Sequence, residues 1–175
     1  MGYKGYNGLR EGTHKSLMIG PGAIFKNFDL DKFDPADPMN TAGELLGATT
    51  GGNTVKVNTE YHDVAVDGTL GPVEHLEWLI AATAQLETTL LEITKENLQL
   101  TLPNFDIAEH NENYDLLKHN GEIAPSSYQN IAIVGNVVGS SFPVVFVLNR
   151  ARVTSQVEIP LGNGKEDVGL KMTFE

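Results

Sequence analysis

Alternation of apolar and polar side chains, with a period of two residues, restricts the fold of this chain more than any other feature. The alternation is clean over Thr54–Thr59 and returns over Val168–Phe174. Successive side chains of a β-strand point to opposite faces of the sheet, so both segments are predicted to be strands with one buried face. Valine-rich runs at 131–138 and 144–153, and a short apolar run at 23–25, predict three further strands.

The segment 77–93 fits two interpretations. With a period of two residues, Trp78, Ile80 and Leu86 share one face, whereas with a period of 3.6 the leucines and isoleucines of the segment form a helical stripe. Four threonines between residues 83 and 94 favour the strand, because β-branched side chains fit a pleated sheet better than a helix.

A short helix is predicted after this segment, with Thr94 as its N-cap and Pro103 ending it. The fold class is therefore mostly β with one short helix, arranged as a sandwich or a barrel. A chain of 175 residues without internal repeats fits one domain, residues 1–175.

Three segments lack periodicity and are predicted to be irregular. Residues 1–16 form an arm that is either disordered alone or ordered by a partner, residues 28–43 form a long exposed loop with two Asp-Pro pairs, and residues 104–129 form a polar loop. The apolar residues that follow the Thr54–Thr59 strand, Val64 and Val66, have even numbers, whereas those within it have odd numbers. This change of face predicts a β-bulge or a turn near residues 61–63.

The charge of the chain is strongly negative. It contains 23 acidic and 12 basic residues, for a formal net charge of −11, which argues against ordinary nucleic-acid binding because phosphates require Lys and Arg. The segment from Glu60 to Glu122 alone holds 13 acidic residues but only two basic ones, Lys95 and Lys118. One interpretation of this excess is simply a solvated acidic surface.

Cysteine and long apolar segments are both absent from the sequence. Without cysteine the chain has no disulfide, thiolate nucleophile or Cys-ligated zinc. No apolar run approaches the ~20 residues of a membrane helix, and the first 15 residues lack the apolar core of a signal peptide. We expect a soluble protein made in a reducing compartment.

The histidines and glycines match no catalytic motif. His62 and His110 lie among acidic residues without the spacing of a zinc-binding HExxH, and the chain has no P-loop, dinucleotide fingerprint or nucleophile elbow. Paired carboxylates carry no information without geometry. The sequence therefore predicts no catalytic residue, metal ligand or cofactor.

An aspartate string, at positions 29, 31, 34 and 37, offers oxygen ligands of the kind that calcium prefers. An EF-hand loop beginning at Asp29 needs Gly at its sixth position and Glu at its twelfth, where this chain has Asp34 and Asn40. The alternative is an Asp-rich turn that satisfies its own backbone.

A family resemblance rests on the order of several features between Glu44 and Thr94. A Gly-Ala-Thr-Thr-Gly-Gly turn at 47–52 leads into an alternating strand, and a valine strand then ends in Asp-Gly-Thr-Leu-Gly-Pro-Val at 67–73. A long amphipathic segment follows and ends in Leu-Leu-Glu-Ile-Thr at 90–94. In this order the features resemble the major tail tube proteins of long-tailed bacteriophages, and the preceding run at 20–29 fits the same pattern.

The resemblance implies a fold of two antiparallel sheets packed as a sandwich or partial barrel, with a flanking helix and a long strand at 77–93. It implies a structural virion protein without enzymatic activity or cofactor, assembled in the host cytoplasm into six-membered rings that stack head to tail. The expected partners are other copies of the chain, a tape-measure protein inside the tube, and terminator and distal tail proteins at its ends. DNA would cross the channel without specific binding.

Two groups of residues gain expected roles from this resemblance. Glu77, Gln85 and Glu87 share a parity on the long strand and are expected to face the acidic lumen or a neighbouring subunit; the alternative is that they face solvent outside. Contacts between rings are expected from the arm and the Asp-Pro loop, through Lys4, Arg10, Lys15, Asp29, Asp31, Asp34 and Asp37. Both segments can equally be plain mobile loops.

Other functions remain open at the level of sequence. A related structural module, such as an Hcp-like secretion tube or a virion decoration protein, would share most of these features. A small acidic enzyme or calcium-binding domain that uses the Asp-rich loop is the alternative from another class.

Overall fold

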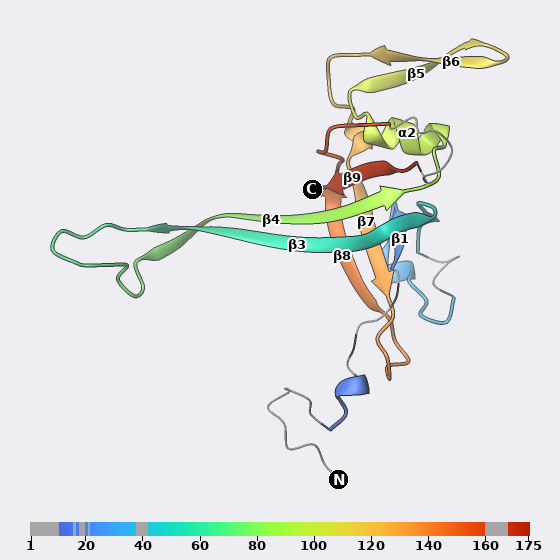
Figure 1. The fold of residues 1–175 in the computed structure, drawn as a ribbon. Helices are drawn as coiled ribbons and strands as arrows, with labels where there is room; N and C mark the ends of the chain where they lie inside the picture. The colour runs from blue at the N-terminus through green and yellow to red at the C-terminus, as the bar shows by residue number, and fades with distance from the viewer. Residues whose placement is uncertain (1–10, 16, 18–19, 21, 38–41, 160–167) are drawn as a thin grey trace. The chain divides into compact units, whose positions relative to one another are not determined.

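A computed structural model describes residues 11–15, 17, 20, 22–37, 42–159 and 168–175. The fold is mostly β, with 47% of the chain in strands and 10% in helices, which confirms the predicted class. The strands are β1 (Ala23–Lys26), β2 (Glu44–Leu45), β3 (Thr49–Asp63), β4 (Glu77–Leu90), β5 (Phe105–Asn111), β6 (Tyr114–His119), β7 (Gln129–Gly135), β8 (Val144–Ala151) and β9 (Leu170–Phe174). The helices are α2 (Lys95–Thr101) and three short 3-10 turns, η1 (Thr13–Lys15), η2 (Leu30–Lys32) and η3 (Pro125–Ser127) (Figure 1).

The strands described form three antiparallel sheets, ordered β2-β1-β7-β8, β3-β4-β9 and β5-β6. The third sheet lies in residues 104–129, where we predicted a loop, so that prediction is wrong. Its strands pair through the register Ile107 with Leu117 and Ala108 with Leu116. Each strand has only two consecutive apolar residues at its centre. A run this short shows no detectable period, so the hairpin was not predicted from the sequence.

Chain contacts divide the protein into two compact units. Unit 1 comprises Met1–Leu46 with Asn130–Val147, and unit 2 comprises Gly47–Gln129 with Leu148–Glu175. That the two units form a single domain stays a prediction.

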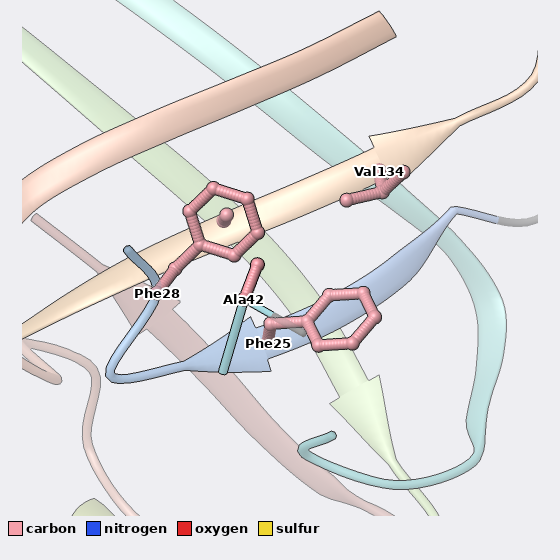
Figure 2. Packing of buried hydrophobic residues seen from close by; sticks show 5 residues of the cluster. Phe25, Phe28, Ala42 and Val134 are labelled. Carbon is pink, nitrogen blue, oxygen red and sulfur yellow. The ribbon is translucent and has the colours of Figure 1, made fainter. Parts of the chain in front are cut away.

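The core of unit 1 is an aromatic cluster beside β1 and β7. Phe25 and Phe28 pack with ring centroids 6.1 Å apart, and Ala42, Ala132 and Val134 complete the cluster (Figure 2). Loop 28–43 is therefore not exposed throughout: its ends, Phe28 and Ala42, are each only 2% exposed. The backbone N–H of Asp29 donates to the carbonyl of Ala42 over 2.6 Å and closes the loop.

Unit 2 is organised around strand β4. This strand confirms that residues 77–90 are extended rather than helical, and its buried Leu86 and Leu90 pair with Phe174 and Leu170 of β9. Helix α2 follows as predicted: the side chain of Thr94 accepts a hydrogen bond from the backbone N–H of Asn97 over 3.2 Å. The helix ends before Pro103, as expected.

Replacing Phe25 with Ala is expected to destabilise unit 1 by about 3–5 kcal/mol, because it leaves a cavity in a closely packed aromatic cluster. Urea denaturation measures the loss. The control is Leu30→Ala, whose side chain is 60% exposed and whose removal should change stability by less than about 0.5 kcal/mol. Equal stability of the two variants would contradict this account of the core.

Candidate assembly surface

The β3–β4 hairpin is much longer than the strand that covers its edge. Strand β9 pairs with β4 only over Leu86–Leu90, so within the described part of the chain residues 77–85 of β4 pair with β3 alone (Figure 1). The outer edge of β3 has no partner among the described strands. The outer part of the hairpin is therefore held only by the pairing between β3 and β4 in the described structure.

A β-bulge at the base of the hairpin explains the Gly-Gly pair of the 47–52 turn. Between the pairs Thr50–Thr89 and Thr54–Glu87, strand β3 has three residues where β4 has one. Gly51 and Gly52 both have positive φ, of 74° and 85°, a conformation that glycine adopts without steric cost. The buried Thr88 hydroxyl donates to the side-chain oxygen of Asn53 over 2.7 Å and holds the bulge.

A second bulge lies in the distal half of the hairpin. Glu60 pairs with Ala81 and Tyr61 pairs with Leu79, so Ile80 is an extra residue on β4. The irregularity lies beside residues 61–63, where a bulge or a turn was predicted, but its extra residue is on the partner strand, so it does not produce the predicted switch of faces along β3. One extra residue reverses the faces of the side chains that follow it.

This reversal corrects the shared face predicted for Glu77, Gln85 and Glu87. Gln85 pairs with Lys56 and Glu87 pairs with Thr54, so these two side chains lie on one face of the hairpin. Glu77 lies beyond the bulge, where it pairs with Asp63 on the opposite face. The prediction assumed that odd-numbered residues share one face along the whole strand. It is wrong here because the extra residue Ile80 shifts the register. The lumen role of these residues stays a prediction.

The face that carries Gln85 and Glu87 is polar in its proximal half, whereas beyond the bulge it carries Trp78, which pairs with His62 and is exposed. The Glu87 carboxylate pairs with the Lys56 ammonium at 2.6 Å, and the Gln85 amide donates to the Glu175 carboxylate over 2.7 Å. Because these groups are substantially exposed, the ion pair adds little stability. It does neutralise the charge of Glu87 locally.

The opposite face is apolar along most of its length. At its base Val55 pairs with Leu86, which is fully buried in unit 2. We define the apolar stripe as the side chains that continue this face outward beyond the reach of β9: Val57, Tyr61, Leu79, Ala82 and Ala84.

Exposure of the apolar stripe is the unusual feature of this surface. Val57 is 73%, Tyr61 58% and Leu79 57% exposed, although they continue a face that is buried at its base. The hairpin tip adds Leu70, which is fully exposed. Contiguous apolar surface of this kind marks an interaction site. The stripe is not predictable from the sequence, because the alternation does not reveal where the covering strand β9 ends.

Only some of the residues predicted to connect rings lie in the described structure. Lys4, Arg10 and residues 38–41 lie outside the described residues, and Lys15 ends the exposed turn η1. Their role in ring contacts stays a prediction.

The aspartates of loop 28–43 cap their own backbone. Asp29 accepts a hydrogen bond from the N–H of Asp31, and Asp34 accepts one from the N–H of Ala36 over 2.8 Å. Lys32 lies 2.9 Å from the Asp29 carboxylate, and its hydrogen bond is the main cause of the lowered pKa of Asp29. Asp31 and Asp37 occupy the same short exposed turns. No metal-ligand cluster of three His, Asp or Glu side chains occurs in the described part of the chain.

The β5–β6 hairpin is held by a lysine at the start of α2. Glu109 and Asp115 pair directly across the two strands, an arrangement in which like charges repel. The Lys95 ammonium lies 2.9 Å from the Asp115 carboxylate and relieves this repulsion. Its hydrogen bond to Asp115 is the main cause of the raised pKa of Lys95.

Helices of the described residues are all too short or too polar to cross a membrane. Compared with models of known protein families, the chain matches none, and it also matches no curated protein sequence.

Replacing Lys95 with Met is expected to loosen β5–β6, because Glu109 and Asp115 are then left facing each other. Hydrogen exchange should accelerate at the amides of Phe105–Asn111 and Tyr114–His119, while those of β4 are unchanged. Since the pKa of Lys95 is raised above 10.5, the wild-type protection should be present at neutral pH and disappear only as the pH rises through that elevated pKa. Unchanged exchange in the variant would refute this role.

Proposed function

We propose that this chain is a structural subunit that assembles with copies of itself into stacked six-membered rings, forming the tail tube of a bacteriophage. The observation that carries the proposal is the apolar stripe. It continues the buried face of unit 2 beyond β9 and leaves Val57, Tyr61 and Leu79 more than half exposed. A stripe of this kind gains hydrophobic stabilisation only when another surface covers it.

The unpaired edge of β3 supports the same proposal. A strand of 15 residues whose outer edge pairs with no other described strand presents backbone donors and acceptors to a further strand. Pairing of sheets between neighbouring copies would satisfy these groups and produce a continuous β-lined wall. The number of six subunits per ring comes from the resemblance of residues 44–94 to tail tube proteins.

Charge supports a channel that DNA crosses without adhering. Six copies of a chain with formal charge −11 carry −66, and such a wall repels phosphate. Of the three predicted lumen residues, Gln85 and Glu87 share the polar face, which would line the channel. Glu77 lies on the face of the apolar stripe, which would contact a neighbouring copy. The protein would then belong to the virion tail, together with a tape-measure protein and the proteins that end the tube.

Negative-stain electron microscopy over a concentration series tests the proposal. The wild-type protein is expected to form rings or hollow filaments. Val57→Ser, Tyr61→Ser and Leu79→Ser combined should raise the concentration needed for assembly at least tenfold without changing the fold, because each side chain is exposed in the single chain. Ile93→Ser with Ile159→Ser, which removes exposed apolar side chains outside the hairpin, should assemble normally. A wild-type protein that stays monomeric at every concentration would overturn the proposal.

A further inference from the structure

A pair of carboxylates ends the apolar stripe. Asp63 and Glu77 lie directly opposite each other on the stripe face, next to the pair Tyr61 and Leu79. Like charges opposite each other destabilise a strand pair, and neither carboxylate forms an ion pair with any described residue. This end of the hairpin therefore suits a partner that combines an apolar surface with a cation.

Arg152 offers the complementary chemistry at the other end of unit 2. Its backbone is fixed by two hydrogen bonds to Glu175, of 3.0 and 2.9 Å. Its half-buried guanidinium reaches only the carbonyl of Val153, at 3.5 Å, and has no carboxylate partner among the described residues. A half-buried cation without a counter-charge is costly, so a carboxylate should bind here favourably.

A hollow of mixed polarity adjoins this arginine. Its volume is about 400 Å³, and its lining combines apolar side chains such as Leu102, Ile123 and Val157 with polar ones such as Asn104 and Ser155. That space is large enough for the side chain of Tyr61 or Leu79. Lys171 also lacks an ion pair, but the hollow beside it is lined mainly by polar side chains such as Thr54, Thr89 and Thr173. Arg152 is therefore the better match for a stripe that ends in carboxylates.

The two features lie too far apart to meet within one chain. Arg152 is hydrogen-bonded to Glu175, which follows Phe174, and Phe174 pairs with Leu86. Glu77 lies nine residues before Leu86 on the same strand, which is roughly 30 Å at the rise of an antiparallel strand. Arg152 can therefore meet the carboxylate pair only when it belongs to a second copy.

We infer that the Asp63–Glu77 pair of one copy binds Arg152 of a second copy, with the end of the apolar stripe seated in the hollow beside that arginine. The inference rests on the proposed self-assembly. Because the two surfaces are different and lie at opposite ends of unit 2, the contact is head to tail. A head-to-tail contact repeats indefinitely and builds a filament.

Charge reversal on each side tests the inference by light scattering and electron microscopy. Asp63→Lys with Glu77→Lys, and separately Arg152→Glu, should each raise the critical concentration for assembly at least about tenfold, since like charges then meet in the contact. The triple variant should recover assembly, because it restores opposite charges. Glu60→Lys is the matched control: it reverses an exposed charge on the polar face of the same hairpin and should leave assembly unchanged.

The outcomes separate the two proposals. If the wild type assembles but Asp63→Lys with Glu77→Lys behaves like Glu60→Lys, the inference is overturned while the assembly proposal stands. Failure of the triple variant to recover, when circular dichroism shows it folded, also overturns the inference. A wild type that never assembles overturns both.

Discussion

The difference in length between β9 and the β3–β4 hairpin is the constraint on which the rest of unit 2 depends. Strand β9 covers β4 only from Leu86 to Leu90, and within this span the apolar face of the hairpin is buried. Beyond it the same face continues through Val57, Tyr61 and Leu79 with no cover among the described residues. The same face of the hairpin is therefore part of the buried core at its base and exposed to solvent further out. Hydrophobic burial favours any arrangement that covers the outer part.

The bulge at Ile80 decides what this open surface carries at its end. Without the extra residue, Glu77 would lie on the polar face with Gln85 and Glu87, and Asp63 would stand alone at the end of the stripe. With it, Glu77 faces the stripe beside Asp63. The hairpin therefore combines an apolar surface with a carboxylate pair, which gives a contact both affinity and a fixed direction.

Periodicity in the sequence was sufficient to predict those elements whose hydrophobic pattern extends over many residues. The alternation and threonine content of residues 77–90 indicated the strand, and Thr94 indicated the start of α2, because a capping side chain acts within three residues. It was insufficient where structure depends on distant pairing. The β5–β6 hairpin has too few apolar side chains for a detectable period, and the face of Glu77 depends on a bulge that only the register with β3 defines. The exposure of the stripe depends on where β9 ends, which no local pattern encodes.

The coverage of the stripe by a second copy is the central claim, and a single introduced thiol measures it most directly because the chain has no cysteine. Ala82 lies on the stripe face opposite Thr59, whereas its neighbour Ala81 lies on the polar face opposite Glu60. Alkylation of Ala82→Cys should be fast in dilute protein and slow by at least tenfold once the protein assembles. Alkylation of Ala81→Cys should slow much less over the same concentrations. Equal protection of the two thiols, or none at either, would contradict the account.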